Sequence, residues 1–152
     1  MPDRRRAAVI LAAGQGTRMR SSIAKPLHAV GGRSLLGWSL ALAEAVDADP
    51  RIVVWGAHSP AVREAAETAG ARTALQDPPQ GTGHAVMQVR EALGGFAGDV
   101  VVLYADTPLI RPETIEALFE ALEDGASVAV LGFEPDEAGG YGRLVLGEDG
   151  GL

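Results

Sequence analysis

The chain has 152 residues, of which 47% are hydrophobic and 22% charged, values typical of a single globular domain and not of a disordered or fibrous protein. The net charge of −7 argues against a nucleic-acid or anionic-membrane partner. Because the sequence has no cysteine, disulfides, thiolate zinc sites and cysteine nucleophiles are excluded.

The first predicted element is a buried strand at residues 8–12, where a short, continuous apolar run suits a strand covered on both faces. The longest apolar run, residues 7–13, is too short to cross a bilayer. Three arginines precede it, as in a secretion signal, but no processing pattern follows. We therefore expect a cytoplasmic protein.

Further strands and four helices are expected to alternate along the chain. The helices have typical ends: Ser34 and Ser59 are predicted N-caps, Pro60 stands at a first helical position, and glycines follow the last turns. This alternation predicts an α/β fold, doubly wound around a mainly parallel sheet. The strands are expected at residues 52–55, 72–75 (the weakest), 100–104 and 127–133, and the helices at residues 34–47, 59–70, 84–93 and 112–123.

The last residues suggest that the chain continues. Residues 142–146 are typical of a strand and residues 148–150 of a hairpin turn. Because only Gly151 and Leu152 follow, the returning strand is missing. We interpret the chain as a fragment.

Positive charge is concentrated at the N-terminal end. Residues 1–33 carry a net charge of +6, whereas the remaining residues carry −13. An acidic body with a basic end suits a small anionic ligand better than a long polyanion.

The loop at residues 11–20 is a candidate phosphate site. It has the first two glycines of a dinucleotide fingerprint, but Met19 takes the place of the third, and it lacks the Gly-Lys-Ser/Thr ending of a P-loop. Its backbone N–H groups can still approach a phosphate, and the Arg18 guanidinium can donate bidentate hydrogen bonds to the phosphate oxygens. Lys25, the only lysine, would add a compact point charge. A plain strand-to-helix turn with a surface arginine is the alternative.

The loop at residues 76–85 is a candidate nucleobase site. Two prolines stiffen it, while Gly81 and Gly83 allow a flat ligand to approach. The Gln76 amide offers the donor and the acceptor needed against a base edge. His84 is interpreted as a helix-start residue and not as a catalyst.

The loop at residues 104–110 places a carboxylate directly after a strand. Asp106 can hold a hard cation there, because Mg²⁺ usually takes one or two protein carboxylates and leaves its other positions to phosphates and water. A capping or structural carboxylate is the alternative interpretation.

Together these loops resemble the sugar-nucleotide pyrophosphorylase family, and within it the bacterial N-acetylglucosamine-1-phosphate uridyltransferases. The first motif is shared by many nucleotidyltransferases, and its combination with residues 81–85 is far more specific. The similarity spans about residues 7–146 and is carried by residues 11–19, 25–28, 31–32, 76, 81–85, 104, 106–109 and 140–143.

The resemblance implies a Rossmann-like fold of the nucleotide-diphospho-sugar transferase type, with UTP and N-acetylglucosamine-1-phosphate as substrates and Mg²⁺ as cofactor. It implies that Arg18 and Lys25 are catalytic residues that hold the UTP phosphates, and that Asp106 ligates Mg²⁺. The substrate-binding residues that it implies are Leu11, Ala12, Ala13, Gly14, Lys25, Gln76, Gly81, Thr82, Tyr104, Ala105, Asp106 and Gly142.

The reaction implied is a magnesium-assisted direct displacement at the α-phosphorus. It yields UDP-N-acetylglucosamine, a precursor of cell wall and lipopolysaccharide, together with pyrophosphate. The positioning and charge neutralisation that such a reaction needs are consistent with the absence of a cysteine nucleophile.

The family pattern also implies that residues 1–152 are the N-terminal part of a nucleotidyltransferase domain. The rest of that domain, with its second metal ligand, and the left-handed β-helix that transfers acetyl groups and forms a homotrimer would be absent. Ala105 stands where the family usually has glycine, and its methyl group would crowd the nucleotide if the backbone passes close to it there. We therefore expect weak uridine nucleotide binding and little or no turnover.

Two other functions stay open at this point. A nucleotidyltransferase of the same fold, of the molybdopterin, thymidylyl or hexose-1-phosphate type, shares the first loop. From another class, a non-catalytic nucleotide-binding module is the second alternative.

Overall fold

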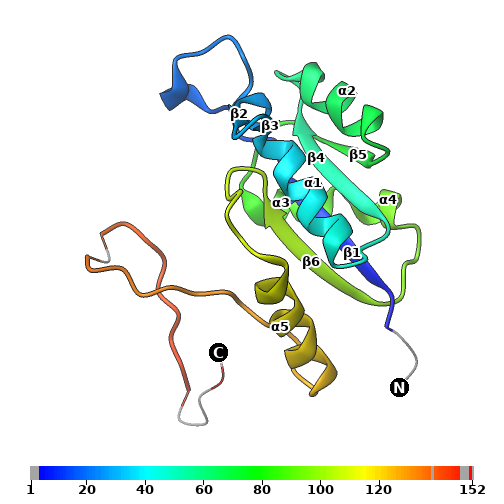
Figure 1. The fold of residues 1–152 in the computed structure, drawn as a ribbon, viewed down its shortest axis with the longest axis vertical. Coiled ribbons are helices and arrows are strands. Elements are labelled where there is room, and N and C mark those ends of the chain that lie inside the picture. The colour runs from blue at the N-terminus through cyan, green and yellow to red at the C-terminus, as the bar shows by residue number, and fades with distance from the viewer. Residues whose placement is uncertain (1–3, 138, 148–150, 152) are drawn as a thin grey trace. The chain divides into compact units, whose positions relative to one another are not determined.

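The computed structural model describes residues 4–137, 139–147 and 151. The chain divides into two compact units, one up to Ala117 and one from Leu118. The first unit contains a parallel four-stranded sheet in the order β5-β4-β1-β6 and a two-stranded antiparallel hairpin of β2 and β3 (Figure 1).

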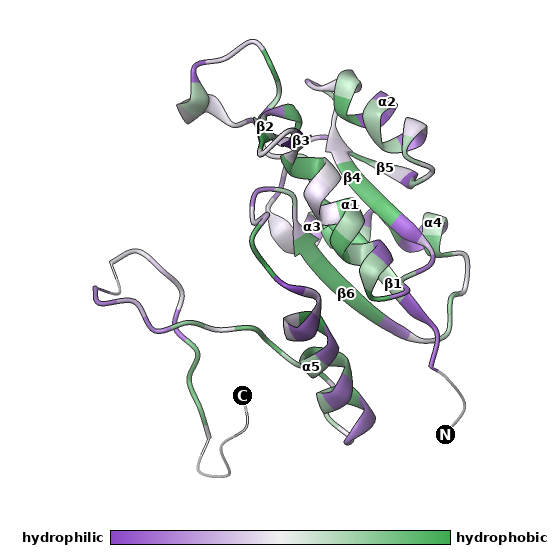
Figure 2. Ribbon diagram, in the orientation of Figure 1, coloured by the Kyte–Doolittle hydropathy of each residue, from purple (hydrophilic) through white to green (hydrophobic). Residues whose placement is uncertain are grey.

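Each strand of the four-stranded sheet lies at one of the apolar runs that were predicted to be strands. Figure 2 shows hydrophobic residues along β4 and β6 and hydrophilic residues at one end of each. Ala8, Val9 and Ile10 are fully buried, as expected for a strand with neighbours on both sides and helices on both faces. The strands are β1 (Arg6–Leu11), β4 (Arg51–Gly56), β5 (Arg72–Gln76) and β6 (Asp99–Tyr104).

Helices cover both faces of this sheet, which confirms the doubly wound architecture. Helix α1 lies in front of the strands in Figure 1. On the opposite face Ala85 and Val89, from the segment of α3 and α4, join Val9, Ile52 and Val54 in one apolar cluster. The helices are α1 (Leu35–Ala45), α2 (Pro60–Thr68), α3 (Thr82–Met87), α4 (Arg90–Leu93) and α5 (Pro112–Glu123).

The helix ends agree with the predictions in part. The Gly37 N–H donates a 3.0 Å hydrogen bond to Ser34 Oγ, so Ser34 is the predicted N-cap of α1. Pro60 is the first residue of α2, but Ser59 makes no capping hydrogen bond with its side chain. The helix expected at residues 84–93 begins two residues earlier and is divided into α3 and α4.

A small hairpin follows the first loop, and the sequence had not indicated it. Strands β2 (Ala29–Val30) and β3 (Arg33–Ser34) are joined by Gly31 and Gly32, whose φ angles are 61° and 82°. Two consecutive positive φ angles are what a two-residue hairpin turn requires, and glycine adopts them without steric cost.

The second unit corrects two strand predictions. The described residues from Leu118 onward contain the end of α5 and no strand, so the strands expected at residues 127–133 and 142–146 do not form. A strand needs a neighbour to pair its N–H and C=O groups, and an apolar run does not supply one. The expected hairpin turn at residues 148–150 lies outside the described residues.

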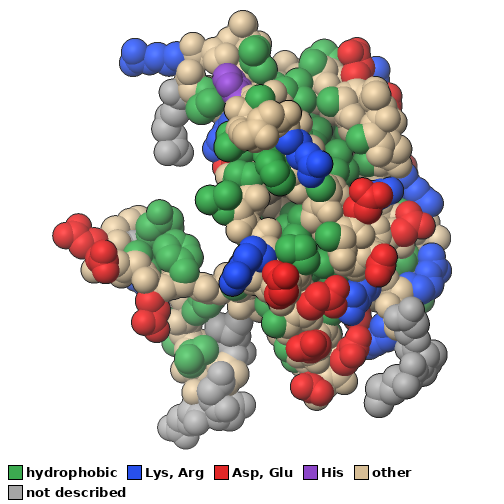
Figure 3. Space-filling model, in the orientation of Figure 1, with side chains coloured by type: hydrophobic (Ala, Val, Ile, Leu, Met, Phe, Trp, Pro, Cys, Tyr) green, Lys and Arg blue, Asp and Glu red, His purple; other side chains and the backbone are tan. Residues whose placement is uncertain are grey.

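Acidic and basic side chains are interspersed on the face drawn in Figure 3. Ion pairs such as Arg51–Glu44, at 3.8 Å, and Arg63–Glu67, at 3.7 Å, fit this pattern. Within the described residues no helix has both the length and the hydropathy needed to span a membrane.

Candidate active site

The order of the sheet strands determines where a ligand site is expected. From β1 the chain continues to β4 and β5 on one side and later adds β6 on the other, so the connections diverge beside β1. Ligands of open α/β sheets bind beyond the carboxyl ends of the strands at such a point. A cleft of about 760 Å³ lies there, and residues from the loops that follow β1, β5 and β6 line it.

The loop after β1 presents free backbone donors. The Ala12 N–H donates to the Val54 carbonyl at 2.8 Å and extends the hydrogen bonding of the sheet past the end of the strand. The N–H groups of residues 13–16 donate no hydrogen bond to any described residue. Because backbone donors are normally paired, these groups are available to an anionic ligand.

The same loop closes onto Lys25, the first residue of the short helix η2 (Lys25–Leu27). Gly16 adopts a φ of 58°, and a Cβ atom built on it would lie 2.8 Å from Lys25 Cβ. Glycine therefore meets two requirements at this position, a left-handed backbone conformation and a close approach to the lysine.

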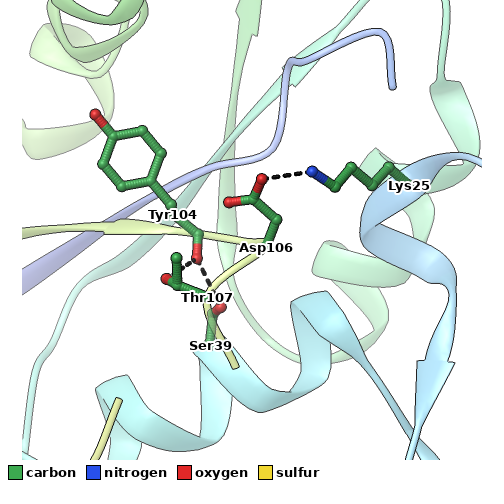
Figure 4. A network of polar contacts seen from close by, with 5 residues as sticks. All are labelled: Lys25, Ser39, Tyr104, Asp106 and Thr107. Carbon is green, nitrogen blue, oxygen red and sulfur yellow. Dashed lines mark hydrogen bonds and ion pairs between the residues drawn. The ribbon is translucent and has the colours of Figure 1, made fainter. Parts of the chain in front are cut away.

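Lys25 and Asp106 form an ion pair inside the cleft. Lys25 Nζ lies 2.6 Å from Asp106 Oδ2, and the two side chains are 37% and 43% exposed (Figure 4). They are the only charged side chains among the described residues that line the cleft. The sequence predicted that Lys25 binds phosphate and that Asp106 binds a cation. In this structure the two side chains bind each other instead.

Contacts from two sides fix the backbone that carries Asp106. The Ala105 N–H donates to the Leu11 carbonyl at 3.1 Å. The Tyr104 carbonyl accepts hydrogen bonds from Thr107 Oγ1 at 2.9 Å and from Ser39 Oγ at 3.4 Å (Figure 4).

Sequence reasoning missed Ser39, although a signal was present. It is a polar residue within the predominantly apolar helix α1, and it is only 3% exposed. A buried hydroxyl requires a hydrogen-bonding partner. Ser39 Oγ lies 3.4 Å from the Leu35 carbonyl of its own helix and 3.4 Å from the Tyr104 carbonyl, so its single proton is shared between these two acceptors.

Gln76 ends β5 and is only 5% exposed. Its Nε2 atom donates to the Gly81 carbonyl at 3.0 Å and lies 3.2 Å from His84 Nδ1. Its Oε1 atom accepts no hydrogen bond from the described chain. Because no fully buried side-chain oxygen or nitrogen of the described residues lacks a partner, Oε1 keeps some exposure, and Gln76 is one of the residues that line the cleft. The acceptor side of the predicted base-reading amide is free, whereas the donor side is already bonded.

Most of the predicted site residues come together in this cleft, and several lining residues had not been predicted. The Arg18 side chain lies outside the described residues, and Gly142 belongs to the second unit. The predicted residues that line it are Leu11, Ala12, Ala13, Gly14, Lys25, Gln76, Gly81, Thr82, Tyr104, Ala105 and Asp106. The others are Gln15, Gly16, Thr17, Met19, Pro26, Pro79 and Ala85.

Ala105 is only 2% exposed, so little of its surface faces the cleft. A methyl group with so little exposed surface has little contact area to offer a nucleotide, so the structure does not favour the crowding considered for this position.

Asp106 has the chemistry of a ligand for a hard divalent cation. Its carboxylate is partly exposed in the cleft, and an ammonium group already occupies the position of a counter-ion. The described residues contain no group of three or more histidine and acidic side chains that could hold a metal. One carboxylate, completed by phosphate oxygens and water, fits Mg²⁺ better than a site built from protein ligands alone.

Comparison with known proteins agrees with this geometry. Residues 8–146 match the family model of the MobA-like NTP transferase domain. The chain is 62% identical over 150 residues to the bifunctional protein GlmU of Maricaulis maris, an alignment that covers 99% of this chain and 33% of that protein. The chain thus spans about a third of the length of the curated relatives it matches.

Solved structures show the same fold. The crystal structure of Rv0371c from Mycobacterium tuberculosis aligns with a TM-score of 0.67 at 23% identity, over 82% of this chain and 63% of that one. The manganese complex of the same protein aligns with a TM-score of 0.60 at 24% identity, over 79% of this chain and 60% of that one.

Proposed function

The chain belongs to the MobA-like NTP transferase family, and we propose that it carries the nucleotide site of a uridylyltransferase that joins UTP to N-acetylglucosamine-1-phosphate. The observation that supports this most is the convergence of three loops on one cleft. The loops contribute free amides, one ammonium group, one carboxylate and one amide oxygen.

The triphosphate would bind at the first loop. The N–H groups of residues 13–16 are unpaired among the described residues and can donate to phosphate oxygens, and Lys25 adds a positive charge beside them. Each charge-assisted hydrogen bond of this kind contributes about 1.5–3 kcal/mol. The resemblance adds Arg18 to this set.

The base would bind at the second loop. Uracil carries an N3–H donor, and the accessible Oε1 atom of Gln76 is a matching acceptor. Gly81 adopts a φ of 90°, and a Cβ atom built on it would have no other atom within 4 Å, which leaves room for a flat ring.

Asp106 would hold Mg²⁺ at the third loop. When bound, the metal would neutralise charge on the phosphates and on the departing pyrophosphate. Rv0371c, which shares the fold, forms a manganese complex. Lys25, which is paired with Asp106 in this structure, would then be able to turn its ammonium group to the phosphates.

The reaction we propose is a direct displacement. An oxygen of the sugar phosphate forms a bond to the α-phosphorus of UTP while the bond from that phosphorus to the bridging oxygen breaks, and pyrophosphate leaves. The protein aligns the two phosphates and stabilises negative charge, and it supplies no nucleophile.

We further propose that the chain corresponds to the first part of a nucleotidyltransferase domain in UDP-N-acetylglucosamine synthesis, which serves cell-wall and lipopolysaccharide formation in the cytoplasm. Acetyl transfer and trimer assembly would belong to regions of the relatives that this chain does not match. Gly142 would approach the sugar.

Calorimetric titration with UTP, CTP, GTP and dTTP in Mg²⁺ tests the proposal. We expect UTP to bind most tightly, and Lys25→Met to weaken it. A preference for another nucleotide would favour a different transferase of this fold.

Pyrophosphate release from UTP and N-acetylglucosamine-1-phosphate tests the reaction itself, in a complete-length version of the protein as well as in this chain. We expect Asp106→Asn to abolish release by the complete-length version. UTP binding without any release by that version would indicate a binding module and contradict the proposed enzyme.

A further inference from the structure

His84 lies between the amides of two glutamines. Its Nδ1 atom is 3.2 Å from Gln76 Nε2, and its Nε2 atom is 3.0 Å from Gln88 Nε2. Each glutamine also donates to a backbone carbonyl at 3.0 Å, Gln76 to Gly81 and Gln88 to His84 itself. The imidazole ring therefore contacts the residue that presents an oxygen to the cleft.

The proton count of the ring restricts these contacts. A neutral imidazole carries one N–H, so it accepts a hydrogen bond at only one of its two nitrogens. It can accept from Gln76 or from Gln88, but not from both. The other glutamine must turn its amide oxygen toward the ring N–H.

Two features determine which glutamine donates from its Nε2 atom to the His84 ring: the burial of the side chain and the Gly81 carbonyl. Gln76 is 5% exposed, and turning its amide would place Oε1 against the Gly81 oxygen, a repulsive contact in a buried place. Gln88 is less buried, so water can replace its bond to the His84 carbonyl. The lower-energy arrangement has Gln76 Nε2 donating to Nδ1 and the proton of the neutral ring on Nε2.

We propose that His84 is a positioning residue for base selection: by accepting from Gln76 Nε2 it holds the Gln76 oxygen toward the cleft, which selects a base with an N–H donor over cytosine. This inference rests on the proposed function, because it requires that Gln76 contacts the base. Uracil offers N3–H to that oxygen, whereas cytosine offers an unprotonated N3, which would face the oxygen lone pairs. A reversed Gln76 amide would favour cytosine instead.

Nucleotide titration of variants tests the role of His84. His84→Phe keeps a ring and removes both nitrogens, and we expect it to reduce the ratio of UTP to CTP affinity by about tenfold, the equivalent of about 1.4 kcal/mol and of one net hydrogen bond. His84→Asn retains an acceptor near the Nδ1 position and should restore most of the preference. Because His84 acts through Gln76, His84→Phe should have no further effect on the preference of Gln76→Ala.

The outcomes separate this inference from the proposed function. If the wild-type protein prefers UTP and His84→Phe retains that preference, or if the two substitutions add, the role of His84 is overturned while the proposed function stands. If the wild-type protein does not prefer UTP over CTP, both are overturned.

Ring ¹⁵N NMR of the wild-type protein provides a readout that needs neither nucleotide nor variant. We expect His84 Nδ1 to give the resonance of an unprotonated nitrogen and Nε2 that of a protonated one. The reverse tautomer would overturn the proposal even if the variants failed to fold.

Discussion

At the scale of single residues, the ion pair between Lys25 and Asp106 is the feature with the clearest consequence. Both groups are partly exposed, at 37% and 43%, and exposed pairs contribute only about 0–1 kcal/mol to stability. The pair is therefore easily opened by a ligand. A free metal ion must compete with Lys25 for the Asp106 carboxylate. A metal–nucleotide complex provides a new partner for both side chains, because its metal can bind Asp106 and its phosphates can bind Lys25.

Lys25→Met is predicted to affect the two ligands in opposite directions. Two unit charges about 4 Å apart interact by about 1 kcal/mol in water. A divalent ion doubles this repulsion to about 2 kcal/mol, so Mn²⁺ alone should bind about thirtyfold more tightly once the ammonium group is removed. UTP should bind about tenfold to a hundredfold more weakly, because it loses a charge-assisted hydrogen bond of about 1.5–3 kcal/mol. Electron paramagnetic resonance of free Mn²⁺ and calorimetry of UTP measure the two effects.

Lys25→Arg is the matched control, since it keeps the positive charge and should leave Mn²⁺ binding nearly unchanged. An unchanged Mn²⁺ affinity in Lys25→Met would contradict the role of the ion pair.

Gly16→Ala is predicted to reduce stability. A φ of 58° is strained for alanine, and the added methyl group would lie 2.8 Å from Lys25 Cβ. The left-handed conformation alone costs about 1–2 kcal/mol, and the contact adds to it. The free energy of unfolding, measured by urea denaturation, should fall by at least about 1 kcal/mol.

Gly14→Ala serves as the control for this prediction, because a methyl group added at Gly14 would have no other atom within 4 Å and the backbone there has no left-handed φ. Equal losses in the two variants would show that the contact with Lys25 is not the cause.

Single-residue chemistry could be predicted in part. Gln76 and Asp106 were identified because their residue types and their places after apolar runs suit a base and a cation. The ion pair of Asp106 and the hydrogen bonds of Gln76 to Gly81 and His84 depend on distances in the folded chain. Residue spacing in the sequence does not predict these distances.

At the scale of secondary-structure elements, the two predicted serine caps provide an internal comparison. Ser34 Oγ accepts from the Gly37 N–H at 3.0 Å, whereas Ser59 makes no such bond. Ser34→Ala should lower the free energy of unfolding by about 1 kcal/mol. Ser59→Ala should change it by less than about 0.5 kcal/mol. Urea denaturation of both variants checks the difference, and similar losses would contradict the capping assignment.

The strand predictions show what an apolar run does and does not specify. Four apolar runs form the strands β1, β4, β5 and β6, because each pairs with a parallel neighbour and helices pack on the sheet. The run at residues 127–133 is also mainly apolar but forms no strand. Hydrophobicity predicts burial, whereas pairing depends on another strand that periodicity does not identify.

At the scale of the whole molecule, the function depends on strand order. The sequence indicated three chemically distinct loops after three strands, and parallel pairing places all three at the same edge of the sheet. The sequence predicted a doubly wound sheet but not which strand lies beside β1, and the structure places β6 there. This order brings Asp106 next to the first loop, where Lys25 meets it.

A two-dimensional ¹H–¹⁵N NMR titration with UTP and Mg²⁺ examines this convergence at every amide. We expect the largest shifts in three separate stretches, residues 11–16, 76–82 and 104–106, with all three saturating at the same nucleotide concentration. Shifts confined to one stretch, or centred on the hollow beside β5 that Thr73, Leu75 and Met87 line, would contradict a single nucleotide site at the ends of the strands.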